Sequence, residues 1–409
     1  MEWKEVRLGD IADVQTGPFG SQLHKSDYIA EGIPCIMPTN IGSHLNFIVD
    51  GIAHVSEVDA NRLSRHLTEF GDIIYARRGD IEKCAYVTTN EEKWLCGTGC
   101  LKIRCNNGVN SRFIAYQLST AECKKWITGN AVGTTMLNLS KGILSNLPLL
   151  VPSHEDQRRI ASILSSLDRK IELNNKINAD LEEMAQAIFK NWFVDFEPFK
   201  DGKFVDSELG MIPEGWKVGR LDEIADVVGG STPSKAKPEY YTQKGIAWLT
   251  PKDLSNHPAV YSSRGEIDIT EEGYNSTSTK LMPKGTVLFT SRAPIGYISI
   301  AQNDICTNQG FKSLVPRKAG TCFLYCFLKY VTPEIENKST GSTFKEASGA
   351  LMKSLQVIMP EQKVFEEFEE IVSPLFARIE SLEKESSRLS LLRDTLLPRL
   401  MSGELEVPE

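Results

Sequence analysis

Hydrophobic residues recur with a helical period over an unusually long stretch of this chain, from Gln157 to Trp192. Apolar residues and two asparagines follow one another there at alternating steps of four and three, which is the spacing of a coiled-coil seam. About 36 residues rising 1.5 Å each predict a rod of roughly 54 Å. The seam positions are Ile160, Leu164, Leu167, Ile171, Asn174, Asn178, Leu181, Ala185, Ile188 and Trp192.

The ends and the middle of this stretch carry further signals. Ser153-His-Glu-Asp156 resembles a capping box at its start, and Pro198 closes it. Asn174 and Asn178 place amides where leucine would stabilise better, a device that fixes the register of a partner helix. A single amphipathic helix lying on its own core is the alternative. The two asparagines favour a second rod elsewhere in the chain.

The sequence repeats itself at an offset of about 210 residues, so two copies of one unit are predicted. Trp3-Lys4 returns as Trp216-Lys217, and Leu8-Gly-Asp-Ile-Ala-Asp13 returns as Leu221-Asp-Glu-Ile-Ala-Asp226. Further matches join Gly32-Ile33 to Gly245-Ile246, Gly71–Arg78 to Gly285–Arg292, Cys96, Leu101 and Lys102 to Cys306, Phe311 and Lys312, and Gly133-Thr-Thr to Gly341-Ser-Thr.

The second rod lies 208 residues after the first. The heptad falls there on Phe368, Val372, Leu375, Ile379, Leu382, Ser386, Leu389, Leu396 and Leu400. Pro374 is an obstacle, because proline inside a helix removes a hydrogen bond, so Ser373-Pro374 is interpreted as the start of a second helix. Pro398 is expected to kink or end the rod.

Each globular half has a mixed pattern. Strands are predicted at 72–76, 147–151, 286–290 and 297–300, helices at 112–126 and 321–330, and turns at 17–21 and 229–234. The fold class is therefore α+β, with two α/β domains in a tandem pseudo-repeat and two long helices. The predicted segments are a first domain at 1–151, a helix at 152–197, a linker at 198–215, a second domain at 216–360 and a helix at 361–405.

Composition and charge refine this division. The 409 residues, 41% hydrophobic and 24% charged, are typical of a globular chain with two or three domains. No apolar run suits a membrane span and no signal peptide is evident, so a cytoplasmic location is expected. A net charge of −8 argues against nucleic-acid binding. However, residues 1–151 carry 15 basic and 16 acidic side chains and 361–409 carry 6 and 12, so the acidic excess belongs to the rods.

Catalytic motifs are missing. The glycine turn at 17–21 lacks the Lys-Ser/Thr ending of a phosphate-binding loop, and no Asn/Asp-Pro-Pro-aromatic string of an adenine methyltransferase occurs. Six histidines are dispersed without a nearby nucleophile, and zinc-protease and serine-hydrolase motifs are absent. Nine scattered cysteines predict buried thiols in a reducing compartment and no metal site. The sequence predicts a protein without chemistry of its own.

Several strings resemble one family. Ile188-Phe-Lys-Asn-Trp-Phe-Val-Asp-Phe-Glu-Pro-Phe199, followed by Ser207-Glu-Leu-Gly-Met-Ile-Pro-Glu-Gly-Trp216, is similar to the central conserved region of type I restriction-modification specificity subunits. Gly230-Ser-Thr-Pro-Ser234, Asn308-Gln-Gly-Phe-Lys312 and Leu396–Leu405 resemble the same family. The chain departs from the pattern at Lys363-Val-Phe-Glu366, where a run like Gln157-Arg-Arg-Ile160 is expected.

The resemblance implies a function. Each globular half would be a target-recognition domain that reads one half of a bipartite site in double-stranded DNA. The two rods would pack antiparallel, set the distance between the domains and dock two methyltransferase (modification) subunits. A restriction/motor subunit would complete the complex. No cofactor is expected in this chain, because S-adenosylmethionine, ATP and Mg²⁺ would belong to those partners.

Base reading favours Arg, Lys, Asn and Gln side chains on exposed loops. The candidates for DNA contact are Gln22, Lys25, Arg77 and Arg78 in the first half and Ser234, Lys235, Lys237 and Arg292 in the second. Solvated charges or structural pairs are the alternative for each of them, and Asn308-Gln309 is equally suited to stabilising a turn.

Two other functions stay open. A free-standing or fused DNA methyltransferase is disfavoured by the missing tetrapeptide. A coiled-coil scaffold that does not bind DNA is disfavoured by the duplicated globular units.

Overall fold

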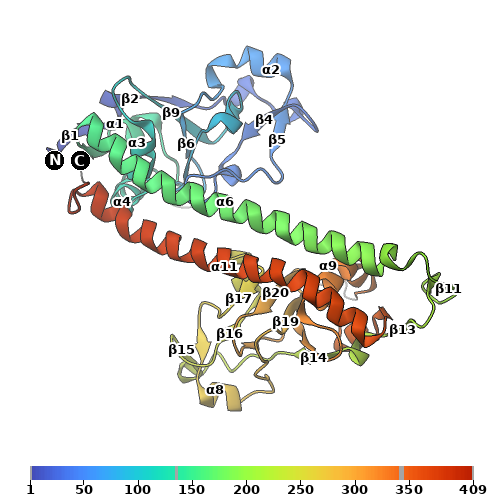
Figure 1. Cartoon of the computed structure of the whole chain (residues 1–409). Helices are drawn as coiled ribbons and strands as arrows, with labels where there is room; N and C mark the ends of the chain where they lie inside the picture. The colour runs from blue at the N-terminus through green and yellow to red at the C-terminus, as the bar shows by residue number, and fades with distance from the viewer. Residues whose placement is uncertain (1, 134–136, 340–344, 408–409) are drawn as a thin grey trace. The chain divides into compact units, whose positions relative to one another are not determined.

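Two long helices run through both compact parts of this computed structural model, which describes residues 2–133, 137–339 and 345–407. Helix α6 spans His154–Phe193 and helix α11 spans Gln362–Met401, each with 40 residues (Figure 1, green and red). The first unit comprises Met1–Ile171 and Ser387–Glu409, and the second comprises Glu172–Ser386. Each unit therefore combines one globular half with parts of both helices. The finer five-segment division stays a prediction.

In the first unit, the first and last strands of the globular half pair with each other. Strand β1 (Lys4–Arg7) pairs antiparallel with β10 (Pro148–Val151). The residues between these two strands along the chain form two four-stranded sheets, in the orders β2-β9-β6-β7 and β3-β5-β4-β8. Their strands are β2 (Ala12–Thr16), β3 (Tyr28–Ile29), β4 (Ile33–Ile36), β5 (Ala53–Val55), β6 (Ile73–Ala76), β7 (Cys84–Tyr86), β8 (Leu95–Cys96) and β9 (Cys100–Cys105).

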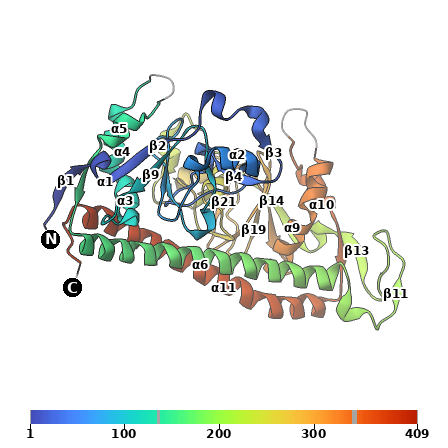
Figure 2. The ribbon, with the colours of Figure 1, turned by 90° about the horizontal axis from the view of Figure 1, so that it is seen from above.

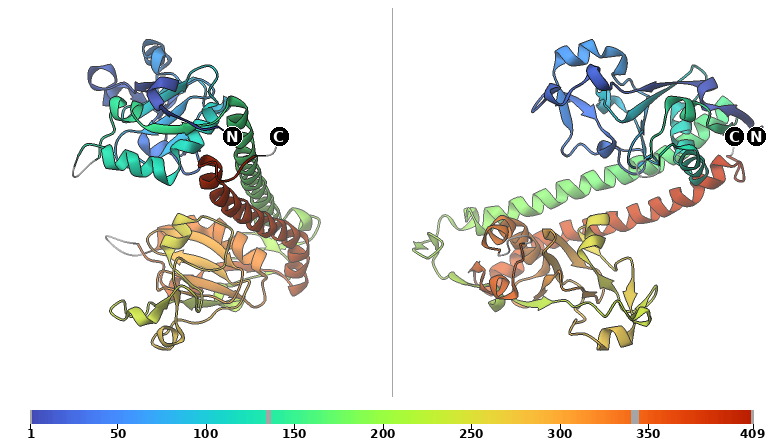
Figure 3. Two further views of the ribbon diagram at one scale, coloured as in Figure 1. Left: turned by 90° about the vertical axis from the view of Figure 1, so that its left-hand side faces the viewer. Right: turned by 180° about the vertical axis from the view of Figure 1, so that it is seen from behind.

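Helices α3, α4 and α5 lie beside β1, β2 and β9 in this unit (Figure 2). Its helices are α1 (Leu8–Ile11), α2 (Glu57–Arg62), α3 (Ser111–Leu118), α4 (Ala121–Asn130) and α5 (Lys141–Ser145). The core formed by the sheet and these helices continues onto the long helices, since Ile160 and Leu164 of α6 and Leu400 and Met401 of α11 are buried in it. Both chain ends lie at one end of this unit (Figure 3), where Gly403 lies against the ring of Trp3.

The second unit repeats this plan. Strand β13 (Lys217–Arg220) pairs antiparallel with β23 (Gln356–Met359), and a five-stranded sheet has the order β14-β22-β19-β20-β17. Its strands are β14 (Ala225–Gly229), β15 (Tyr241–Thr242), β16 (Trp248–Leu249), β17 (Tyr261–Ser262), β18 (Asp268–Ile269), β19 (Val287–Ser291), β20 (Ile295–Ala301), β21 (Cys306–Thr307) and β22 (Lys312–Pro316). Its helices are α7 (Pro251–Asn256), α8 (Glu271–Asn275), α9 (Thr321–Lys338) and α10 (Gly349–Ser354). The linker forms a hairpin of β11 (Phe204–Val205) and β12 (Ile212–Pro213).

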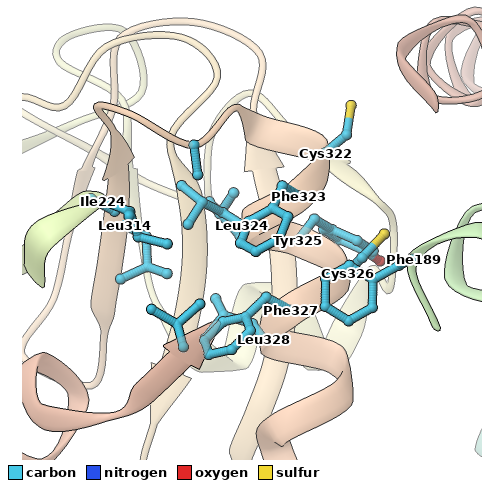
Figure 4. Close-up of a cluster of buried hydrophobic side chains, with 14 of the residues drawn as sticks. Phe189, Ile224, Leu314, Cys322, Phe323, Leu324, Tyr325, Cys326, Phe327 and Leu328 are labelled. Carbon is cyan, nitrogen blue, oxygen red and sulfur yellow. The ribbon is translucent and has the colours of Figure 1, made fainter. Parts of the chain in front are cut away.

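Aromatic side chains join the long helices to the core of the second unit. Phe189 of α6 lies against α9, with its ring 5.4 Å from that of Phe323 (Figure 4). The ring centre of Phe193 lies 4.9 Å from that of Phe323 and 5.1 Å from that of Phe368 of α11. Full burial of each such side chain stabilises the fold by about 1.5–3 kcal/mol. The helices are therefore part of this core.

Strand pairing confirms the internal duplication. The pairs β2–β9 and β6–β9 recur as β14–β22 and β19–β22 with the same antiparallel sense. One predicted match is wrong by a residue. Gln15 faces Lys102, whereas its counterpart Val228 faces Ser313. Lys102 therefore corresponds to Ser313 and not to Lys312, and the matches at Cys96 and Leu101 shift likewise. The match of Gly133-Thr-Thr to Gly341-Ser-Thr lies almost wholly outside the described residues.

The long helices pair antiparallel, as predicted. Asn174 is fully buried and donates hydrogen bonds to Glu385 Oε2 at 2.9 Å and to Ser386 Oγ at 3.2 Å. Further along α6, Trp192 lies 6.1 Å from Phe368 of α11. Contacts nearer the C-terminus of α6 thus involve residues nearer the N-terminus of α11, so the two helices run antiparallel. Ser153 Oγ accepts a hydrogen bond from Asp156 N at 3.2 Å at the start of α6, as the capping pattern predicted.

The prediction about the prolines of the second rod is wrong. Helix α11 continues through Pro374 and Pro398 without a second start or an early end. Both prolines are exposed, so the carbonyl that loses its partner one turn earlier can bind water. The buried seam of α6 also shifts after Ala185. Phe189 and Phe193 are buried, while Ile188 and Trp192 are only partly buried, because that end of the helix packs on α9 as well as on α11.

Other seam positions vary in burial. Val372, Ile379 and Leu382 are buried on α11. Positions that are only partly buried are Leu167, Ile171, Leu181, Leu375, Leu389 and Leu396.

Local turn chemistry changes the predicted helices of the globular halves. The stretch 112–126 forms two helices because Thr120 caps α4, its Oγ1 accepting from Cys123 N at 3.4 Å. The helix predicted at 321–330 extends to Lys338. Eight of the nine cysteines are buried and Cys105 is partly buried, so the prediction of buried thiols is confirmed. Among the helices described, none combines the length and apolar character that crossing a membrane requires.

Two equivalent glycines mark the closest approach of backbone segments in each unit. A Cβ atom on Gly17 would lie 2.1 Å from the carbonyl oxygen of Gly97, and one on Gly230 would lie 2.1 Å from that of Asn308. No side chain fits at such a distance. Glycine is therefore required where the turn after β2 crosses the loop before β9, and where the turn after β14 crosses the loop before β22.

We expect Gly230→Ala to lower the free energy of unfolding by about 1–3 kcal/mol, because the added methyl group overlaps backbone. Urea denaturation followed by circular dichroism measures the loss. Gly129→Ala is the control: no atom lies within 4 Å of the added Cβ in helix α4, so its stability should be unchanged or raised by up to about 1 kcal/mol. Equal stability of Gly230→Ala and the wild type would contradict the crossing.

Candidate functional site

Three segments of each unit converge at the glycine crossing. In the first unit Arg77 N donates to Gly99 O at 2.8 Å, and Pro38 packs against Gly99. In the second unit Ser291 N donates to Gly310 O at 2.7 Å, and Pro251 packs against Gly310. We call this arrangement the loop junction. It comprises residues 17–25, 77–80 and 97–99 in the first unit and residues 230–237, 291–294 and 308–310 in the second.

The first loop junction carries two adjacent arginines. Arg77 is tied by its backbone, because its carbonyl accepts from Leu139 N at 2.9 Å. Burial, with a smaller effect of neighbouring Arg78, lowers the pKa of the Arg77 guanidinium. Arg78 is exposed, and its backbone pairs with Asn138. Within the described part of the chain, Arg77 Nε and Asn138 Oδ1 are buried without a hydrogen-bond partner.

Gln22 and Lys25 lie on the turn that follows Gly17. Lys25 is exposed and Gln22 is partly exposed. Gln22 Oε1 accepts from Phe19 N at 3.4 Å, so this side chain also stabilises its own turn. Thr98 Oγ1 donates to Pro18 O at 2.8 Å and joins this turn to the loop before β9. The four predicted residues of the first half thus belong to segments that the crossing brings together.

The second loop junction presents lysines along one exposed segment. Ser234, Lys235 and Lys237 are exposed. Lys237 Nζ lies 2.9 Å from the Tyr240 hydroxyl and 4.9 Å from the centre of its ring. That hydrogen bond raises the pKa of Lys237. Thr232 hydrogen-bonds to Gln309 and links this segment to the 308–310 loop.

Arg292 belongs to a group of three charges. Its guanidinium lies 3.5 Å from Glu346 Oε2, and Lys312 Nζ lies 3.6 Å from the other carboxylate oxygen. The Arg292 side chain keeps 36% of its surface exposed. Neither Glu346 nor Lys312 was among the sequence candidates. An acidic residue 54 positions beyond Arg292 carries no local signal of this role, and Lys312 was noted only as part of a repeated string.

Asn308 stabilises the turn, as one sequence interpretation held. Its Oδ1 accepts from Gly310 N at 2.8 Å. Within residues 2–133, 137–339 and 345–407, histidine, cysteine and acidic side chains form no cluster of three or more that could hold a metal ion. The loop junctions instead gather guanidinium, ammonium and amide donors, the groups that bind phosphates and base edges.

Comparison with known proteins shows the family to which this chain belongs. The family model described as "Type I restriction modification DNA specificity domain" matches residues 1–183 and again residues 213–390. The chain belongs to this family. It is a type I restriction-modification specificity subunit with two target-recognition domains, each carrying one loop junction. The family resemblance seen in the conserved strings is thereby confirmed.

Two specificity subunits match over most or all of their length. The type I restriction enzyme MjaIX specificity subunit of Methanocaldococcus jannaschii is 28% identical over all of this chain and 94% of that protein. The HindI specificity subunit of Haemophilus influenzae is 26% identical over 99% of this chain and all of that protein. The crystal structure of a type I restriction-modification S subunit from M. genitalium aligns over 98% of this chain and 96% of that one. Its TM-score of 0.60 at 18% identity shows the same fold.

In this specificity subunit Glu346 neutralises two cations of the second recognition domain. We expect Glu346→Gln to strengthen binding to duplexes that lack the target, because Arg292 and Lys312 become available to phosphates. The plot of log binding constant against log salt concentration should steepen by about one unit. Titration of a labelled duplex at several salt concentrations measures this slope. Glu334→Gln is the control, since Glu334 pairs with Lys338 within helix α9. A slope equal to that of the wild type would show that these cations do not contact phosphate.

Proposed function

We propose that each target-recognition domain reads one half of a bipartite site in double-stranded DNA through its loop junction. The observation that carries this proposal is the duplication of the junction itself. Gly17 against Gly97 in one domain and Gly230 against Asn308 in the other form the same backbone crossing. A duplicated reading surface on one chain suits a target made of two separate parts.

The two junctions present different side chains on this shared backbone. Arg77, Arg78 and Asn138 of the first domain correspond to Ser291, Arg292 and Glu346 of the second, as the matched bonds of Leu139 and Ala347 indicate. Arginine pairs well with guanine, and carboxylates accept from cytosine N4. The two half-sites should therefore differ in sequence.

Unpartnered polar atoms support base contact in the first domain. Arg77 Nε and Asn138 Oδ1 are buried without partners among the described residues, although buried polar groups are nearly always paired. One is a donor and the other an acceptor. Both atoms are shielded from solvent, so a base edge would satisfy them once the two side chains turn outward on binding, and this favours a hydrogen-bonding role over a purely electrostatic one.

We further propose that the two long helices dock two methyltransferase subunits and set the spacing between the half-sites. The internal repeat places an exposed apolar side chain at equivalent positions, Met184 on α6 and Leu392 on α11, 52% and 46% exposed. Each unit carries one of them. Two equivalent surfaces suit two copies of one partner, and exposed apolar groups favour a protein over DNA.

The remaining partners follow from this assignment. A restriction/motor subunit would join the methyltransferase complex, and S-adenosylmethionine, ATP and Mg²⁺ would bind to those subunits. The chain itself would carry out no catalytic step, in keeping with the lack of catalytic motifs in its sequence. The complex would act in the cytoplasm, on DNA.

The test of half-site reading uses Arg292→Ala in the assembled methyltransferase complex. We expect recognition to weaken or relax at the second half-site alone, by about 1–3 kcal/mol if the guanidinium contacts a base bidentately. Mapping of methylated bases on a library of randomised targets measures both half-sites together. Arg317→Ala is the control, because Arg317 pairs with Asp226 at the other end of β22. Equal losses at both half-sites would argue against modular reading.

The spacing role is tested by lengthening both helices together. Asn174 lies beside Ser386, so Ile171 and Leu389 are at about one level three residues nearer the first domain. Inserting four residues after Ile171 and four before Leu389 adds about 6 Å to each helix and leaves the contacts of Asn174, Glu383 and Asp168 in place. The spacer of the target should then grow by roughly one or two base pairs at 3.4 Å each.

Methylation mapping of the lengthened complex gives the new spacer, and both half-site sequences should stay the same. The control inserts four residues after Gly210 in the exposed linker and should leave the spacer unchanged. An active lengthened complex with the original spacer would show that the helices do not set the distance.

A further inference from the structure

One loop occupies the same place in both recognition domains. Leu45 O accepts from Tyr86 N at 2.9 Å in the first domain, and Val260 O accepts from Ile300 N at 2.7 Å in the second. Tyr86 and Ile300 lie on the equivalent strands β7 and β20. We call residues 42–46 and 257–261 the edge loops. Each edge loop is held by a charged side chain of helix α11.

Arg393 holds the edge loop of the first domain. Its side chain is 5% exposed and donates to Asp168 Oδ1 of α6 at 2.9 Å, while a second nitrogen lies 3.4 Å from His44 Nε2. Burial, and then the charge of Arg393, lower the pKa of His44, so the neutral imidazole accepts from the guanidinium. Asp168 also accepts from the Tyr116 hydroxyl of helix α3. Arg393 therefore ties the loop to both long helices.

The edge loop has few other means of attachment on this side. His44 and Leu45 have φ angles of 56° and 65°, in the left-handed region that side chains rarely adopt. A cavity of about 310 Å³ lies between the loop, Lys124 and the helices. Leu45 anchors the loop in the core and on strand β7, whereas on the side of the cavity the polar contact of His44 to Arg393 joins the loop to the helices.

Glu383 holds the edge loop of the second domain. Its carboxylate accepts from Val260 N at 2.7 Å and from Tyr261 N at 3.0 Å. Burial raises the pKa of Glu383 to about 7, against the lowering effect of these two backbone donors. The cost of burying a carboxylate is met at this site by bonds that only one backbone orientation can supply.

We propose that Arg393 and Glu383 are positioning residues that fix the orientation of the two recognition domains on the helix pair, and thereby the spacing of the DNA half-sites. This inference rests on the proposed function. Apolar packing is non-directional, whereas a buried charged hydrogen bond is lost when its two groups turn away from one another, so these bonds add a defined orientation to the packed cores. Both side chains lie on α11, so one helix orients both domains.

The experiment measures spacer preference in the assembled methyltransferase complex. Duplexes carry both half-sites with spacers from two base pairs shorter to two longer than the preferred length. The variants are Arg393→Met and Glu383→Leu. The wild type should methylate one spacer far better than its neighbours. In each variant this preference should fall about tenfold, the equivalent of one lost charged hydrogen bond. Discrimination against mismatched half-sites should not change.

Matched variants separate positioning from folding. Arg388→Met alters an exposed arginine of the same helix and should leave the spacer preference intact. His44→Asn breaks the contact from the loop side, because asparagine tolerates a positive φ and is too short to reach Arg393. His44→Asn should weaken the spacer preference as Arg393→Met does. It also tests the same contact if the Arg393→Met protein fails to fold. Arg393→Lys keeps the charge but lacks the planar fork, and should recover only part of the preference.

The outcomes distinguish this inference from the function on which it rests. An unchanged spacer preference in folded His44→Asn and Glu383→Leu complexes overturns the positioning role. Relaxed half-site discrimination without a change in spacer preference also overturns it. A wild-type complex that ignores both half-sites overturns the proposed function itself.

Discussion

Burial of the long helices in the domain cores is the constraint on which the rest of this structure depends. Ile160 and Leu164 are buried in the first core and Phe189 and Phe193 in the second. Neither core is complete without parts of both helices. An ordinary linker would leave each domain free to turn, whereas here the connecting elements are themselves core. The same side chains therefore complete each domain core and fix that domain to the helices.

The loop junctions show how one backbone arrangement can carry two different sets of side chains. The glycines at the crossings exclude side chains where segments touch, and the neighbouring positions are free to differ. Ser291 stands in the second domain where Arg77 stands in the first, with the same backbone bond to the next loop. The buried Ser291 hydroxyl adds a bond to Gly310 O at 3.1 Å, whereas the neighbouring Arg292 keeps part of its surface exposed. The backbone bond between the segments is therefore kept while the side chains at these positions differ.

Much of this architecture could be predicted from the sequence, because its signals are periodic or repeated. The heptad and the offset of the two copies gave the helices and the tandem domains. Predictions failed where distant contacts override local rules. Pro374 stands within a helix because its face is exposed, and the seam moves to Phe189 because α9 packs there. Glu346 pairs with Arg292, and Glu383 accepts a hydrogen bond from Val260 N. Both contacts join residues far apart in the sequence, so no local pattern encodes them.

The first unit includes Ser387–Glu409 as well as residues up to Ile171. Leu400 and Met401 are buried in its core, and Gly403 lies against Trp3. A chain synthesised in order therefore makes most of its first domain early but lacks part of that core until Leu400 and Met401 have been added. The second unit, from Glu172 to Ser386, has all its residues sooner. The domain whose synthesis begins first is thus the one whose set of core residues is completed last.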